Sequence, residues 1–85
     1  MNISKDEQRV LHALAQGGLI KVEKNEKNKI IKILCFNRDG WVLTHCTMII
    51  FNKLRKKGLV ASKNSLPYRI TSLGIRTVRA QLDNR

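Results

Sequence analysis

The residues of this chain whose side chains could bind a metal or attack a substrate are two histidines and two cysteines. They are His12, Cys35, His45 and Cys46. Zinc sites in small domains place their ligands at CxxC or HxxxH spacing, and this sequence has neither. A catalytic cysteine needs a stabilised thiolate and an oxyanion pocket, and no pattern here signals them. We therefore expect buried thiols and ordinary surface or capping histidines, with no metal and no cofactor.

Other catalytic patterns are also missing from the sequence. It has no glycine-rich loop that could cradle a phosphate, and no pair of carboxylates in a helical register suited to acid–base catalysis. Asp6 and Glu7 are explained by helix capping. A chain of 85 residues buries a modest core and leaves little apolar material for an enclosed pocket. We expect a protein that binds a macromolecule, not an enzyme with a small-molecule substrate.

Basic residues are the second group that could do chemistry. Seventeen Lys and Arg face six Asp and Glu, which gives a formal net charge of +11. Such a surplus favours an anionic partner, with nucleic acid first, then an acidic protein surface, then an anionic membrane. The alternative is a basic domain whose charge serves solubility or ribosome association.

The sequence contains no targeting or membrane-spanning pattern. No run approaches the ~18 apolar residues of a transmembrane helix, and the N-terminus lacks the apolar core of a signal peptide. The protein is expected in the cytoplasm, without a membrane partner and with reduced cysteines.

The densest basic cluster lies at the end of a predicted helix that has Thr44 as its cap and stops at Gly58. Its buried stripe is expected to be Thr47, Ile50, Phe51 and Leu54. Lys53, Lys56 and Lys57 share the opposite face, where they could neutralise phosphates or bind an acidic protein surface. The alternative is a solvated helix end at which cations suit the dipole. With the neighbouring loop, the predicted nucleic-acid or partner-binding patch is Lys53, Arg55, Lys56, Lys57, Lys63 and Arg69.

A helix and a β-hairpin are predicted before this basic helix. Ser4 and Glu7 form a capping-box pattern that begins a helix, and Gly17-Gly18 end it. Residues 19–24 and 29–36 then read as the strands of a hairpin. Apolar residues occur on both faces of the second strand, so we expect it to be covered from two sides. Five lysines crowd this hairpin, either as a second phosphate-contacting arm or as a guard against edge-to-edge aggregation. They are Lys21, Lys24, Lys27, Lys29 and Lys32.

Trp41 follows a predicted turn at residues 37–40. An exposed tryptophan would be a strong contact for a protein partner. The average burial of tryptophan favours the other interpretation, in which Trp41 closes the edge of a small core.

After the basic helix, residues 59–61 and 66–71 read as a second short hairpin. Thr71 or Ser72 caps a last helix. Its apolar positions are Leu73, Ile75, Val78 and Leu82. The fold class is therefore α+β, a single domain over residues 1–85 with the order α-β-β-α-β-β-α.

The segment NKLRKKGLVASKNSLPYRITSLG, residues 52–74, resembles the recognition helix and wing of winged-helix proteins. A basic helix ends in GLV, and a polar tip leads to YRIT and LG. The hairpin at residues 19–36 takes the place of the usual short middle helix, which departs from the standard DNA-docking arrangement. The resemblance implies a winged-helix-like domain.

Read as a whole, the chain resembles the YjhX family of small bacterial proteins. The likeness rests on SKDEQRVLHALAQG, CFNRDGWVLTHCT, NKLRKKGLVASKNSLPYRIT and above all the terminal VRAQLDNR. It implies a bacterial cytoplasmic toxin that inhibits DNA topoisomerase I and is paired with an acetyltransferase-like antitoxin. The alternative is a winged-helix transcriptional regulator that binds duplex DNA.

Overall fold

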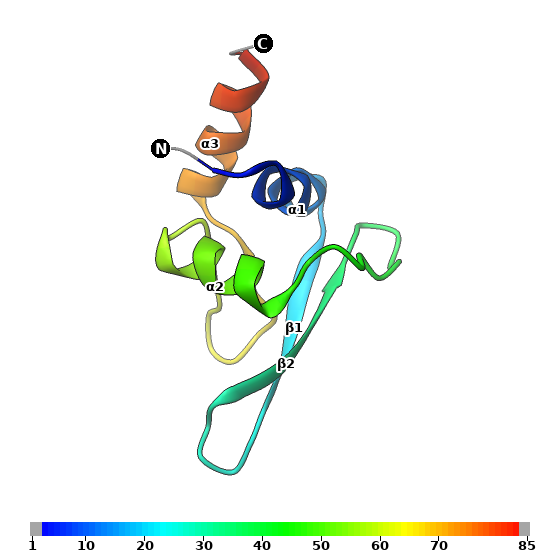
Figure 1. Ribbon diagram of the computed structural model, residues 1–85, viewed down its shortest axis with the longest axis vertical. Helices are drawn as coiled ribbons and strands as arrows, with labels where there is room; N and C mark the ends of the chain where they lie inside the picture. Colours follow the sequence, from blue (N-terminus) through cyan, green and yellow to red (C-terminus); the bar gives the residue numbers. More distant parts are fainter. Residues whose placement is uncertain (1–2, 84–85) are drawn as a thin grey trace.

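A computed structural model describes residues 3–83, with side chains through residue 80. Over this range a small α+β domain has three helices and two two-stranded sheets. The elements are α1 (Lys5–Ala15), β1 (Leu19–Lys24), β2 (Ile30–Phe36), α2 (Met48–Lys56), β3 (Val60–Ala61), β4 (Arg69–Ile70) and α3 (Ser72–Asp83). The molecule is elongated, 44 × 26 × 22 Å, because the β1–β2 hairpin projects away from the three helices (Figure 1).

The first helix begins at the predicted capping box. The Ser4 hydroxyl accepts a hydrogen bond from the Glu7 amide at 3.2 Å, and the Glu7 carboxylate accepts one from the Ser4 amide at 3.2 Å. These two bonds satisfy amides that have no partner inside the helix. One face of α1 buries Val10, Leu11 and Leu14 in the core.

The β1–β2 hairpin pairs Leu19 with Phe36 at its base and turns through residues 25–29. The prediction that the second strand is covered on two sides was wrong. Ile31 and Leu34 are 57% and 39% exposed, whereas Cys35 is buried. The core cluster gathers on the face that carries Ile20 and Cys35, and the other face carries no packed helix within the described residues.

The second helix starts one turn later than predicted. Thr47, not Thr44, is its N-cap, and the Thr47 hydroxyl accepts a hydrogen bond from the Ile50 amide at 3.3 Å. Thr47 is therefore an exposed cap and not part of the buried stripe. The Leu43 amide donates to the Cys35 carbonyl at 2.8 Å, which holds Leu43 beside β2, and residues 44–45 form a turn before the helix begins.

The average burial of tryptophan predicted that Trp41 would close the edge of the core, and this prediction was wrong. Trp41 is 73% exposed in the loop after β2. The Asn37 side chain accepts hydrogen bonds from the backbone amides of Asp39 and Trp41, which closes a tight turn. The indole is left in solvent.

The second hairpin joins the first through one backbone bridge. The amide and carbonyl of Ile20 exchange hydrogen bonds with those of Tyr68 at 2.9 and 2.8 Å. The Tyr68 ring packs edge-on against Phe51 of α2, with ring centroids 5.0 Å apart. The Thr71 hydroxyl then caps α3 by accepting from the Gly74 amide at 3.1 Å. The side chain of Leu82, a predicted apolar position of this helix, lies outside the described residues.

Among the described residues, no helix has both the length and the apolar character needed to cross a membrane.

Candidate functional site

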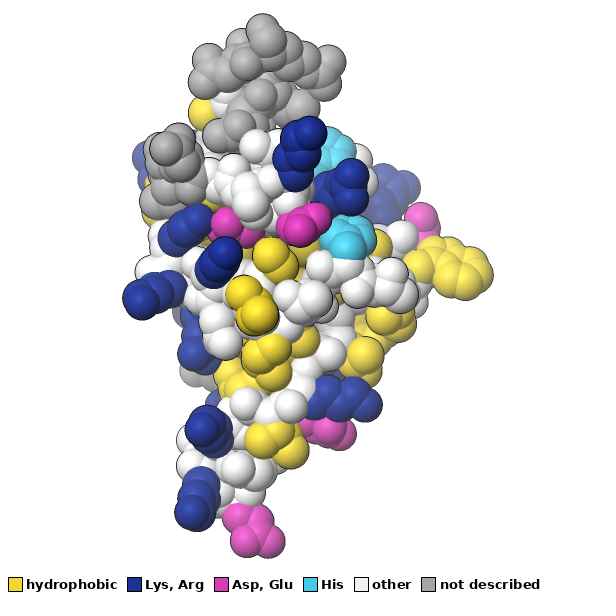
Figure 2. Space-filling model, in the orientation of Figure 1, with side chains coloured by type: hydrophobic (Ala, Val, Ile, Leu, Met, Phe, Trp, Pro, Cys, Tyr) yellow, Lys and Arg dark blue, Asp and Glu magenta, His cyan; other side chains and the backbone are white. Residues whose placement is uncertain are grey.

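The buried stripe of α2 decides which of its cations face solvent. Ile50, Phe51 and Leu54 point into the core, so Lys53 and Lys56 lie exposed on the outer side of the helix. Figure 2 shows Lys and Arg side chains along the left side of the molecule, over α2 and down to the tip of the β1–β2 hairpin. The basic end of α2 and the lysine-rich hairpin therefore contribute to one side of the protein.

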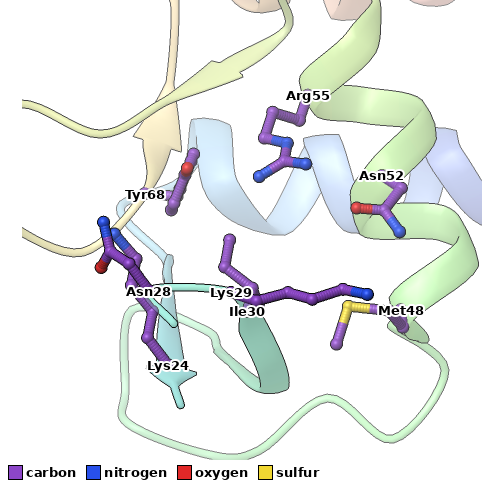
Figure 3. A pocket seen from close by; sticks show the side chains of 8 residues that line it. All are labelled: Lys24, Asn28, Lys29, Ile30, Met48, Asn52, Arg55 and Tyr68. Atoms are coloured by element: carbon purple, nitrogen blue, oxygen red, sulfur yellow. The ribbon is translucent and has the colours of Figure 1, made fainter. Parts of the chain in front are cut away.

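A groove of about 470 Å³ lies between α2 and this hairpin. We call it the α2 groove. It is lined by Lys24, Asn28, Lys29, Ile30, Met48, Asn52, Arg55 and Tyr68. Arg55 and Asn52 reach down from α2, while the Lys29 side chain extends across from the hairpin toward Met48 (Figure 3). The groove thus combines three cations with amide and hydroxyl groups, and none of the described residues that line it is a carboxylate.

Packing holds Arg55 over the groove. Its guanidinium lies 5.5 Å from the centre of the Phe51 ring, and Phe51 itself is fixed edge-on against Tyr68. A guanidinium over an aromatic face gains cation–π attraction and keeps its planar set of donors for a ligand. Because Lys24 and Lys29 approach from the opposite wall, the groove suits a chain of phosphates or carboxylates.

Lys57 does not line the α2 groove. Its Nζ lies 2.8 Å from Oε2 of Glu7, whose side chain is only 3% exposed. Burial alone would raise the pKa of Glu7, but hydrogen bonds from Lys57 and Ser4 outweigh it and hold the pKa below its ordinary value. The predicted face of Lys53, Lys56 and Lys57 is therefore divided, because Lys57 is used to bind α1.

The structure also separates Lys63 and Arg69 from the groove. Lys63 is exposed in the loop between β3 and β4 and does not line it. Tyr68 lines the groove, and Arg69, the next residue, lines a different pocket with Lys21 and Arg38. Neighbouring residues of an extended strand point to opposite faces, which accounts for the separation.

Of the predicted patch, only Arg55 lines the α2 groove. Lys24 and Lys29 were expected as one of two alternatives for the hairpin, whereas Asn28, Asn52 and Tyr68 were missed. The sequence does carry one signal for Asn28 and Tyr68: the lysine-rich turn at residues 24–29 and the YRIT segment both contain polar groups next to strand ends. The sequence pattern does not indicate that this turn and the YRIT segment both lie against α2.

The side chain of Cys35, in β2, contacts that of Cys46, in the loop that precedes α2. Cys35 is buried and Cys46 half-buried, and both are free thiols. A hydrogen bond between the thiols, together with burial, raises the pKa of Cys35, while the same hydrogen bond lowers the pKa of Cys46 against the effect of burial. His45 Nε2 is buried and has no hydrogen-bond partner among the described residues. Within the described part of the chain, no three His, Cys, Asp or Glu side chains are grouped so that they could hold a metal ion.

The fold and groove define a small α+β domain with a cation-lined groove. Comparison with known proteins identifies the family. Residues 1–85, the whole chain, match the YjhX toxin family, which is described as "Putative toxin of bacterial toxin-antitoxin pair". The chain belongs to this family, as its sequence resemblance predicted.

Similar proteins occur in several bacteria under the name UPF0386 protein. The relative from Parvibaculum lavamentivorans is 61% identical over the full length of both chains. A relative from Beijerinckia indica is 58% identical, again over the full length of both. One from Caulobacter vibrioides is 56% identical over all of this chain and 93% of its own. No solved structure matches this chain.

Proposed function

We propose that this protein is the toxin of its pair and that it inhibits DNA topoisomerase I by binding the enzyme through the α2 groove. Membership of the toxin family supports the first part. The observation that carries the second part is the meeting of Lys24, Lys29 and Arg55 in a groove whose described lining residues include no carboxylate. Such a groove complements an acidic surface, and complementary charge speeds association and selects the partner.

The protein acts by occupancy and not by catalysis in this proposal. A binding inhibitor holds its target only while bound, so inhibition follows the amount of complex and does not grow with time. The resemblance to the YjhX family further implies an acetyltransferase-like antitoxin, which would relieve inhibition by binding the toxin. Both partners are bacterial and act in the cytoplasm.

The test is relaxation of a negatively supercoiled plasmid by purified topoisomerase I with increasing amounts of this protein. We expect inhibition that extra enzyme relieves at constant plasmid, because the enzyme is the bound component. Relief by extra plasmid at constant enzyme would show instead that the protein coats DNA. Full relaxation at a large molar excess of this protein, in modest salt, removes the proposal.

A second candidate is a winged-helix regulator that binds duplex DNA. It is favoured by the succession of a basic helix, α2, and a short hairpin with Lys63 exposed between β3 and β4. Contacts to five phosphates predict that log affinity falls with log salt at a slope of about −4.5. A gel-shift or anisotropy titration with a short duplex at several salt concentrations measures that slope, and absence of binding at low salt excludes this candidate.

A further inference from the structure

A second pocket, also of about 470 Å³, lies on the face of the β1–β2 hairpin that is turned away from the α2 groove. We call it the hairpin pocket. Its lining includes Leu19, Lys21, Phe36, Arg38, Gly40 and Arg69. Leu19 and Phe36 are cross-strand partners, and Lys21 follows on the same face of β1, so these residues form one continuous floor.

The hairpin pocket combines an apolar floor with a cationic rim. Leu19 and Phe36 are half-buried, and Lys21 Nζ lies 5.6 Å from the centre of the Phe36 ring. Arg38 and Arg69 complete the rim, and none of the lining residues that the structure describes is acidic. Asp39 lies outside the pocket, 4.0 Å from Arg38, with both side chains about 70% exposed. That weak pair leaves Arg38 able to turn toward another carboxylate.

Exposed apolar side chains continue from this pocket. Val42 is 49% exposed and faces Phe36 across a backbone bridge, and Leu34 lies two residues before Phe36 on the same face. Trp41, next to Val42, is 73% exposed. Figure 2 shows hydrophobic side chains along the right side of the molecule, over the end of β2 and the loop that follows. Apolar surface next to a tryptophan and arginines is typical of the centre of a protein–protein interface.

We propose that the hairpin pocket and Trp41 form the docking site for the antitoxin, which places a carboxylate-bearing segment among Lys21, Arg38 and Arg69 and packs apolar side chains against Trp41 and Val42. The proposal depends on the protein being the toxin of its pair. A second copy of this chain fits poorly, because it carries the same charge of +11 and the same cationic rim. Nucleic acid fits poorly too, because phosphates gain nothing from the aliphatic part of this surface.

The position of Trp41 makes a direct test possible. It is the sole tryptophan of the chain, so labelling the protein with 5-fluorotryptophan gives one fluorine resonance. The probe is the cognate antitoxin, taken as the unlabelled product of the gene adjacent to that of this protein. We expect the resonance to move to a bound position at a one-to-one ratio, as the indole leaves solvent.

Substitutions then locate the contact. Trp41→Ala should weaken antitoxin binding about 30-fold, the loss typical of a central tryptophan at an interface. Leu66→Ala is the matched control, since Leu66 is also exposed, at 62%, but lies in the loop between β3 and β4; it should change affinity less than about twofold. Trp41 contributes to its turn only backbone groups: its amide donates to the Asn37 side chain, and its carbonyl accepts from the Asn37 amide. Trp41→Ala should therefore leave the fold intact, which circular dichroism checks.

A functional assay separates this inference from the proposed function. Trp41→Ala should inhibit topoisomerase I like the unmodified protein, but the antitoxin should no longer relieve that inhibition. The docking site is wrong if the antitoxin does not bind the unmodified protein, or if it binds the Trp41→Ala variant equally well. It is also wrong if the resonance moves with the concentration of this protein alone, which would indicate self-association. If the antitoxin binds through Trp41 but topoisomerase I is not inhibited, the proposed function fails and the docking site stands.

Discussion

Lys57 Nζ donates to Oε2 of Glu7 across 2.8 Å and so ties the end of α2 to the first turn of α1. The other carboxylate oxygen of Glu7 accepts a hydrogen bond from the Ser4 amide. One buried carboxylate therefore caps a helix and holds a second helix in place. Because Lys57 is engaged in this ion pair, the proposed binding surface consists of cations other than Lys57.

Removing Lys57 should destabilise the fold more than removing its neighbour. Lys57→Met leaves the buried Glu7 carboxylate without its cation, and we expect a loss of about 2 kcal/mol in the free energy of unfolding. Lys56→Met is the matched control on the exposed side of α2 and should cost less than about 0.5 kcal/mol. Urea unfolding followed by circular dichroism measures both, and equal losses would mean that the ion pair adds no stability.

The same carboxylate should make stability depend on pH. Because the folded pKa of Glu7 lies below its ordinary value of about 4.5, the folded state binds this proton less readily than the unfolded state. The stabilisation is complete above about pH 5 and is lost as the pH falls through the lowered pKa. The difference in unfolding free energy between the unmodified protein and Glu7→Gln should therefore shrink below about pH 4.5. A difference that grows on acidification would contradict this assignment.

Gly74 marks a close approach between α3 and β4. A Cβ at this position would lie 2.5 Å from both the Leu59 carbonyl oxygen and Cγ1 of Ile70, although the backbone angles are ordinary. Gly74→Ala should lower the unfolding free energy by about 2 kcal/mol through overpacking. Ser72→Ala, at an exposed position of the same helix, should change it by less than about 0.5 kcal/mol. A Gly74→Ala variant of unchanged melting temperature would show that α3 can shift without loss.

The thiols should react in a fixed order. Cys46 is half-buried and its pKa is lowered by the hydrogen bond with Cys35, whereas Cys35 is buried and its pKa is raised. Iodoacetamide at pH 8 should modify Cys46 first and reach Cys35 only on unfolding, because the thiolate is the reactive form. Peptide mass spectrometry over a time course measures the order. In Cys46→Ser the fast phase should disappear, and its survival would assign the fast phase to Cys35.

Features that depend on nearby residues could be predicted from the sequence. The capping box of α1 needs only Ser4 and Glu7, three positions apart, and the β1–β2 hairpin needs two apolar runs around a polar turn. The start of α2 could not be predicted in the same way. Thr44 and Thr47 are both competent caps that the local pattern does not distinguish, and the structure uses Thr47, whose hydroxyl accepts from the Ile50 amide.

The candidate site was predicted less well, because it depends on contacts between distant segments. Glu7 and Lys57 are 50 residues apart, and nothing in helical spacing shows that they pair. The α2 groove likewise needs the hairpin to pass beneath α2, which brings Lys29 opposite Arg55. Trp41 lies 73% exposed in a turn closed by hydrogen bonds to Asn37, which average burial cannot reveal.

The most direct test of the central claim compares two variants of equal charge in the plasmid relaxation assay. One replaces the three groove cations, Lys24, Lys29 and Arg55, with Gln. The other replaces three exposed cations away from the groove, Lys5, Arg9 and Arg79, with Gln. We predict that the groove variant loses inhibition of topoisomerase I at least tenfold while the control variant changes less than about twofold, because contacts at a bound surface carry most of the affinity. Equal loss in both variants would show that total charge, not the α2 groove, determines the inhibition.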